Sequence, residues 1–179
     1  NPDMTLQTIE GDSTFVKELL TDGKCDIAFL RSESSSVKEF NSIPYMIDYL
    51  TAVLPATHPL ANADNLPFEQ LRGETFLLFP EHSFINDLCI RECRNAGFEP
   101  HIAYTGNRGA TLIDLVRNGA GITLMMHHSA RQENDSSLAF IPVTPGIYSY
   151  ISLNYAKEKP LSPQAESFVR YVKAHKRDF

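Results

Sequence analysis

The chain has 179 residues, 42% hydrophobic and 21% charged, with a formal net charge of −6 at pH 7. This length suits one domain or two small lobes, and it can bury a core without disulfides or a metal. No apolar run approaches the ~20 residues of a membrane span, so no transmembrane helix is predicted. The 16 Lys and Arg are scattered, so the chain lacks the basic face that duplex DNA requires. The densest basic run, KAHKRDF at the end, is interpreted as a solvated helix terminus.

The first elements predicted are a strand, a helix and a second strand. The segment TLQTI, at 5–9, is interpreted as the strand, and it passes through a polar loop into the helix. Apolar residues at helical spacing then form one stripe, namely Phe15, Val16, Leu19 and Leu20. Asp22-Gly23 ends this helix, because glycine readily adopts the left-handed conformation of a C-terminal cap. The apolar run at 27–30 predicts a buried strand.

The middle and the end of the chain predict two long extended segments and a closing helix. Residues 49–61, YLTAVLPATHPLA, and residues 147–159, IYSYISLNYAKEK, both contain alternating apolar residues. Two such crossings would join two α/β lobes into a hinged binder. Residues 162–175 predict the last helix, with Ser162 as N-cap and Pro163 in its first turn.

The stretch LIDLVRNGAGITLMM, at 112–126, repeats the order of helix, glycine and strand found at 15–30. Glycines beside an apolar run often mark a phosphate-binding loop. Such loops lead from a strand into a helix, however, whereas Gly119 and Gly121 follow a helix and precede a strand. We therefore interpret both glycines as structural.

Three junctions run in the functional direction, from a strand through a polar loop into a helix. They lie at residues 10–14, 80–83 and 106–109. In an open parallel sheet, ligands bind outside the carboxyl ends of the strands, where such loops gather. The start of each following helix also offers free N–H groups and the positive end of its dipole, which suits an anion. The alternative is that the polar side chains cap their own helices, as Ser13, Thr14, Ser83 and Asn107 would do.

Signatures of catalysis and of metal binding are absent from the sequence. There is no G-x-S-x-G elbow, P-loop or H-E-x-x-H helix, so we predict a protein that is not an enzyme and has no cofactor. His127-His128 is interpreted as lying in an extended segment, where neighbouring side chains point to opposite faces and rarely share an ion. Cys89 and Cys93 are one helical turn apart. They are interpreted as two cytosolic thiols, with a redox switch as the alternative.

Several strings resemble the effector-binding domain of LysR-type transcriptional regulators. Each string is weak alone, but their order and spacing together cover nearly the whole chain. The matching strings are Leu20, Gly23, Asp26, Ala28 and Phe29 followed by Arg31; HPLA at 58–61; LRGETFLLFP at 71–80; AGFEP at 96–100; LVRNGAGITL at 115–124; and PLSPQAESF at 160–168.

This resemblance implies an α/β fold of two Rossmann-like lobes joined by two crossing segments, like a type 2 periplasmic binding protein. It divides the chain into lobe I, residues 1–52 plus 148–179, and lobe II, residues 53–147. A small effector, commonly an organic anion, would bind between the lobes, with Arg31 as its counter-charge. The alternative for Arg31 is a surface arginine after a strand. Carried onto this sequence, the effector-binding positions are Asp12, Ser13, Thr14, Arg31, Pro80, His82, Ser83, Phe84 and Asn107.

The resemblance also implies a cytoplasmic regulator that forms a homodimer or homotetramer and has no contact with membranes. It would reach promoter DNA through an N-terminal winged helix-turn-helix that lies outside this chain. Two departures are expected: the family's first strand and helix precede Asn1, and Met126 replaces a common proline. The alternative function is a transporter's solute-binding protein, which would require a secretory signal.

Overall fold

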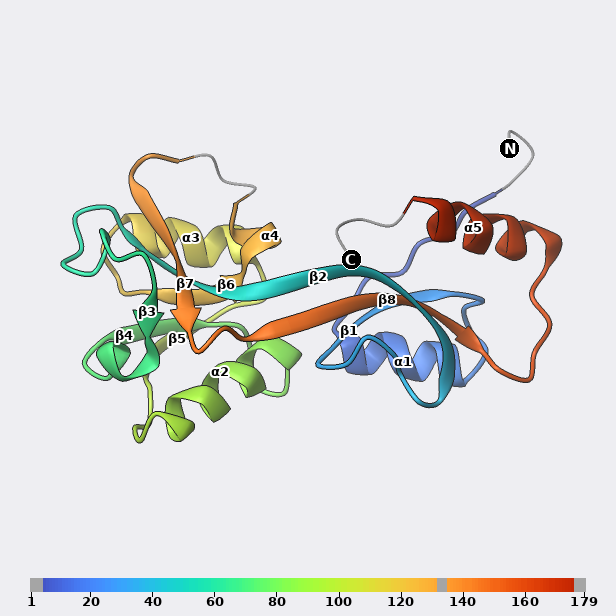
Figure 1. Cartoon of the computed structure of the whole chain (residues 1–179), viewed down its shortest axis with the longest axis horizontal. Helices are drawn as coiled ribbons and strands as arrows, with labels where there is room; N and C mark the ends of the chain where they lie inside the picture. The colour runs from blue at the N-terminus through green and yellow to red at the C-terminus, as the bar shows by residue number, and fades with distance from the viewer. Residues whose placement is uncertain (1–4, 132–134, 176–179) are drawn as a thin grey trace. The chain divides into compact units, whose positions relative to one another are not determined.

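The computed structural model describes residues 5–131 and 135–175, and Figure 1 shows the arrangement of their helices and strands. Helices and strands alternate through much of the chain, as the sequence predicts. In chain order the elements are α1 (Ser13–Thr21), β1 (Ala28–Ser32), β2 (Phe40–Pro55), β3 (Leu66–Pro67), the short 3-10 helix η1 (Phe68–Leu71), β4 (Thr75–Leu78), α2 (Phe84–Asn95), β5 (His101–Thr105), α3 (Gly109–Arg117), β6 (Thr123–Met126), α4 (His127–Ala130), β7 (Leu138–Thr144), β8 (Tyr148–Ala156) and α5 (Pro163–Ala174).

The chain divides into two compact units. Unit 1 contains residues 1–47 and 149–179, and unit 2 contains residues 48–148. The chain passes from one unit to the other within β2 and again at the start of β8. Among the described residues, no helix has both the length and the apolar character that are needed to cross a bilayer.

The sheet of unit 2 has one strand that runs against all the others. Strand β2 pairs antiparallel with β6 on one side and with β7 on the other, and β7 pairs parallel with β3. Strand β4 pairs parallel with β5 and is joined to the β6 end of the sheet by a parallel bridge between Phe76 and Ile122. The carboxyl ends of β3, β4, β5, β6 and β7 therefore lie along the same edge.

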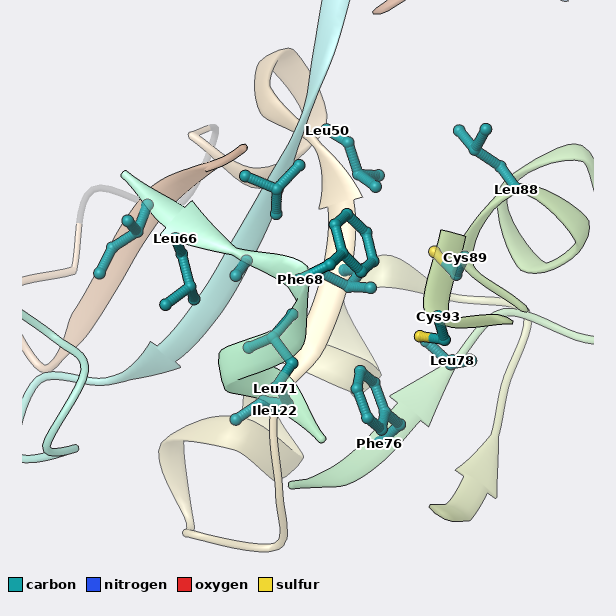
Figure 2. Packing of buried hydrophobic residues seen from close by; sticks show 14 of the residues in the cluster. Leu50, Leu66, Phe68, Leu71, Phe76, Leu78, Leu88, Cys89, Cys93 and Ile122 are labelled. Carbon is teal, nitrogen blue, oxygen red and sulfur yellow. The ribbon is translucent and has the colours of Figure 1, made fainter. Parts of the chain in front are cut away.

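Alternating side chains divide the core of unit 2 between the two faces of this sheet. One face carries Leu50, Leu124 and Met126, which pack with buried residues of α2 and η1; Figure 2 shows part of this cluster. The other face carries Val53 and Met125, which pack with buried residues of α3. Because both faces are covered, β4 and β6 are apolar at nearly every position, as expected for parallel strands. Figure 1 shows α2 and α3 on opposite sides of these strands.

Unit 1 has the same layered plan with fewer strands. Strands β1 and β8 pair antiparallel, and β8 is also the neighbour of β2. Leu20 of α1 packs with Leu30 and Phe40, whereas Val169 and Val172 of α5 pack with Ile43 and Leu153. The two clusters are separate, so α1 and α5 cover different faces of the strands.

The structural interpretation of the two glycines is confirmed. Gly119 has a φ of +75° and Gly121 a φ of +156°. A Cβ atom on Gly121 would lie 2.4 Å from the carbonyl oxygen of Thr75. The same oxygen accepts a hydrogen bond from the N–H of Ile122 at 2.8 Å. Glycine is therefore required because the chain enters the sheet in direct contact with the backbone of β4.

The prediction of a strand at residues 5–9 is wrong. These residues are exposed and have no strand pairing; the side chains of Leu6 and Ile9 are 64% and 49% exposed. A strand is stable only when a neighbour satisfies its backbone groups, and no described residue pairs with this segment. Asn1 and Pro2, at which the family pattern begins, lie outside the described residues, as do the last four residues of the basic tail.

Candidate functional site

The loops that follow β4, β5 and β6 come together at the carboxyl edge of the unit 2 sheet. They are residues 80–83, residues 106–108 and the start of α4. A Cβ atom on Gly109 would lie 2.7 Å from Cε of Met125 and 3.7 Å from Cζ of Phe79. The beginning of α3 thus contacts both β6 and the residue after β4. This edge contains five of the predicted site residues, Pro80, His82, Ser83, Phe84 and Asn107.

The loop at 80–83 is held in shape by its own hydrogen bonds. The Ser83 hydroxyl donates to the carbonyl of Pro80 at 2.7 Å and accepts from the N–H of Asn86 at 3.3 Å. The buried amide of Asn86 donates to the carbonyl of Phe79 at 2.8 Å. His82 has a φ of +66°, an uncommon conformation for a residue other than glycine. Ser83 is confirmed as the N-cap of α2, while the side chain of His82 is exposed.

The first and third junctions are capped differently from what the sequence predicts. Asp12 is the N-cap of α1, and its carboxylate accepts from the N–H groups of Thr14 at 2.9 Å and Phe15 at 3.0 Å. Ser13 and Thr14 are therefore not N-caps but first-turn residues. At α3 the N-cap is Arg108, which makes no side-chain capping bond, so the prediction for Asn107 is also wrong. At α1, Asp12 is the cap because its charged carboxylate accepts from the N–H groups of Thr14 and Phe15 more strongly than a neutral serine or threonine hydroxyl would.

Arg31 in unit 1 is a half-buried arginine rather than a freely exposed one. It lies on β1, opposite Ile151 of β8 in the sheet register. Its Nη1 donates to the hydroxyl of Ser149, itself fully buried, at 2.6 Å. Since α1 packs on β1 and the chain reverses between them, the end of β1 and the start of α1 lie at the same end of unit 1. Arg31 is thus placed toward the end at which Asp12, Ser13 and Thr14 begin α1.

A buried polar cluster at the same edge of unit 2 was missed by the sequence analysis. Asp48 is 1% exposed, and its Oδ1 accepts from the N–H groups of Tyr49 at 3.0 Å and His128 at 3.1 Å. The Tyr49 ring stacks on the His127 ring, with centroids 4.3 Å apart. The Thr51 hydroxyl lies 3.3 Å from Nδ1 of His127. A detectable signal was Asp48, the one charged residue of β2.

The two histidines lie in α4 rather than in an extended segment, so that interpretation is wrong. Met126 is both the last residue of β6 and the N-cap of α4. The backbone therefore turns from strand into helix with no loop between them. Burial, together with the charge of Arg131, lowers the pKa of the His127 imidazole. His127 is therefore neutral at pH 7 and can accept or donate one hydrogen bond toward Thr51. No three His, Cys, Asp or Glu side chains of the described ranges are grouped so that they could hold a metal ion.

The comparison with known families decides the class of this fold. Residues 1–177 match the family described as LysR substrate binding domain. The chain belongs to the LysR substrate-binding domain family. The expected α/β fold of two lobes, similar to periplasmic binding proteins, is thereby confirmed.

Individual relatives agree with this assignment. The HTH-type transcriptional regulator YwbI of Bacillus subtilis is 27% identical over 175 residues, which are 97% of this chain and 58% of that protein. The transcriptional dual regulator GltC of the same organism is 25% identical over 164 residues, or 91% of this chain and 55% of that protein. This LysR-type domain thus spans little more than half the length of these relatives.

Solved structures agree at the level of the fold. The regulatory domain of Synechocystis CcmR, solved in complex with 2-PG, has a TM-score of 0.83 at 16% identity over 94% of this chain and 81% of that one. The matched relatives are named as transcriptional regulators, and the family assignment confirms the prediction of a ligand-sensing regulatory domain.

The three cysteines of this LysR-type domain are free thiols. Cys89 and Cys93 are both 0% exposed on the inner face of α2, and Figure 2 shows their sulfur atoms within the core cluster. Burial raises the pKa of Cys89 well above its usual value and that of Cys93 to about 12. Because the thiolate is the reactive form, these two residues act as small apolar groups in the folded domain.

A hollow of about 310 Å³ lies beside the buried polar cluster, at the end of β7. Tyr49, which stacks on His127, also forms part of its wall. Tyr148, Asn65 and Thr144 add further polar groups. The LysR-type domain therefore combines two loops, the starts of α2, α3 and α4, and this hollow along one edge of unit 2.

Proposed function

We propose that this domain binds a small organic anion as its effector at the carboxyl edge of the unit 2 sheet. The observation that carries this proposal is that residues 80–83, residues 106–108 and the start of α4 lie at one edge of the sheet, to which α4 also brings His127 beside the buried Asp48. Helices α2 and α3 both begin at this edge, so their free N–H groups and positive dipole ends favour an anion there. Asp48 does not oppose this charge directly, because it is buried and already accepts two backbone N–H groups.

The effector contacts proposed in unit 2 are Pro80, His82, Ser83, Phe84 and Asn107. The contacts proposed in unit 1 are Asp12, Ser13, Thr14 and Arg31. Arg31 supplies a planar guanidinium, which binds a carboxylate with two parallel hydrogen bonds. Its bond to Ser149 holds the side chain in one orientation, and this lowers the entropy lost on binding. Asp12 contributes by fixing the first turn of α1 rather than by attracting the anion.

The whole protein is proposed to be a cytoplasmic transcriptional regulator. Relatives of similar sequence are named as transcriptional regulators, YwbI among them as HTH-type, and this chain corresponds to only part of each. We infer that the whole protein carries an N-terminal winged helix-turn-helix and forms a homodimer or homotetramer. Effector binding to the present domain would change how the paired DNA-binding domains engage promoter DNA.

A thermal-shift screen of small carboxylates tests the proposed ligand class. A ligand present at one hundred times its dissociation constant adds about 2.7 kcal/mol to the free energy of unfolding, which is visible as a shift of several degrees. Calorimetric titration of the best compound into Arg31→Ala and Asn107→Ala should then show a Kd raised roughly tenfold or more for each. Arg94→Ala is the matched control, since Arg94 is exposed and pairs with Glu99 away from this edge. Unchanged affinity in both variants would contradict the proposed contacts.

A further inference from the structure

A second hollow lies in unit 1, and none of its lining residues is among the residues proposed to contact the effector. It has a volume of about 370 Å³ and lies among the end of β8, the segment that leads to α5, and one side of α5. This volume is within the range of small-molecule sites, roughly 300–1,000 Å³. The effector site proposed above gives this hollow no role.

The walls of this hollow are strongly basic in a chain that is acidic overall. Four cationic side chains surround it, whereas Glu166 is the one carboxylate among the lining residues. The net charge of the chain is −6, so this concentration of positive charge is not a consequence of composition. The cations are Lys157 and Lys159 after β8, and Arg170 and Lys173 on α5.

Most of this positive charge has no counter-charge in the described part of the chain. Lys159 lies 4.0 Å from Asp26, and both side chains are more than half exposed. Lys157 donates to the backbone carbonyl of Lys38 at 2.6 Å, which leaves two of its three N–H donors for another acceptor. The side chains of Arg170 and Lys173 have no hydrogen-bond or ion-pair partner among the described residues. They are three positions apart on α5, where like charges repel, so a bound anion would remove an existing repulsion.

The rest of the lining fits the body of a small molecule. The half-buried Tyr155 ring presents an aromatic surface, and Leu161 and the buried Val169 add apolar contact. The amide of Asn41 donates to the carbonyl of Ala156 at 3.4 Å, which fixes it at the rim. A ring with a charged substituent matches both parts of this lining.

We propose that this hollow binds a small phosphomonoester, with its phosphate among the four cations and its apolar or ring-shaped body against Tyr155. A phosphomonoester carries a charge of about −1.5 to −2 at pH 7 and three strong acceptor oxygens. The cations remain in excess after Glu166 and Asp26 are counted, so a dianion is better matched than a single carboxylate. A concave site between two elements favours a small molecule over a DNA backbone, which requires basic groups spread along an exposed face.

The test is an NMR titration of the ¹⁵N-labelled chain in 0.15 M NaCl. The probes are phenyl phosphate, inorganic phosphate and phenol. Phenyl phosphate should perturb the amides of residues 155–173 most strongly and bind more tightly than inorganic phosphate, and phenol should leave these amides unchanged. Arg170→Gln and Lys173→Gln should each raise the Kd for phenyl phosphate about tenfold, since a hydrogen bond to a charged group contributes ~1.4 kcal/mol or more. Both side chains are exposed, so the variants keep their fold, which circular dichroism verifies.

The matched control is Lys24→Gln, which removes one exposed cation from unit 1 outside the hollow and should change the Kd less than twofold. Equal affinity of the parent and of both α5 variants would overturn the proposal. So would perturbations that sodium sulfate reproduces at the same concentration, because they would report only ionic screening. An acidic peptide or short duplex DNA that perturbs the same amides at lower concentration than phenyl phosphate would also overturn it, and would assign the hollow to a macromolecule.

Discussion

Replacement of Asp48 by alanine tests whether this buried carboxylate organises the edge of the unit 2 sheet. The substitution removes the acceptor of two backbone N–H groups, those of Tyr49 at 3.0 Å and His128 at 3.1 Å. A hydrogen bond to a charged group contributes about 1.5–3 kcal/mol, and the saved desolvation of the carboxylate offsets part of the sum. We therefore expect Asp48→Ala to lower the free energy of unfolding by about 3 kcal/mol. Asp48→Asn keeps an acceptor oxygen and should cost about 1 kcal/mol.

Urea unfolding followed by circular dichroism measures both effects. At this chain length, ~3 kcal/mol corresponds to a decrease in Tm of roughly 6–12 °C. The control is Asp64→Ala, because Asp64 is exposed in the same unit, and a change within about 0.5 kcal/mol is expected there. The reasoning is refuted if Asp48→Ala costs less than about 1 kcal/mol, or if the asparagine variant is as unstable as the alanine variant.

Three further outcomes are expected. Gly121→Ala should lower the free energy of unfolding by about 3 kcal/mol, measured with urea, because its Cβ would lie 2.4 Å from the Thr75 carbonyl oxygen. Gly73→Ala, whose Cβ would have no atom within 4 Å, should lower it by less than about 1 kcal/mol. Equal losses would refute the packing argument. Because the pKa of His127 is lowered, the folded chain binds a proton at this imidazole more weakly than the unfolded chain does. The free energy of unfolding should therefore fall as the pH decreases below 6.5. His127→Gln should make this pH dependence less steep. Cys89 and Cys93 should react with Ellman's reagent only as fast as the chain unfolds; rapid reaction of either in the folded chain would contradict their burial.

Local sequence patterns correctly predicted the features that depend only on residues close together in the chain, such as helix ends and N-caps. The helix stops at Gly23 and Gly119 were predicted correctly, because a positive φ is a property of the residue itself. Ser162 and Ser83 were predicted correctly as N-caps for a similar reason, since a cap bond spans only three residues. The predicted strand at 5–9 failed because a strand depends on a partner that sequence periodicity does not identify.

In the candidate site, too, the local features were predictable and the contacts between distant residues were not. The loops at 80–83 and 106–108 were predictable, since the order of strand, polar loop and helix places them at the carboxyl ends of parallel strands. The cluster of Asp48, Tyr49 and His127 was not, because it joins β2 to α4 across almost eighty positions of sequence.

The sequence by itself determined the family, the order of most elements, the two structural glycines and two of the helix caps. These features depend on residues that are neighbours in the chain or on strings that share an order. Only the tertiary structure decided which polar groups are buried and what they contact. Asp48 becomes a buried acceptor because β2 pairs with β6 in a register that brings its carboxylate to the backbone of His128. Likewise, Lys157 and Arg170 line one hollow because α5 packs back onto the end of β8, and sequence spacing alone does not specify that contact.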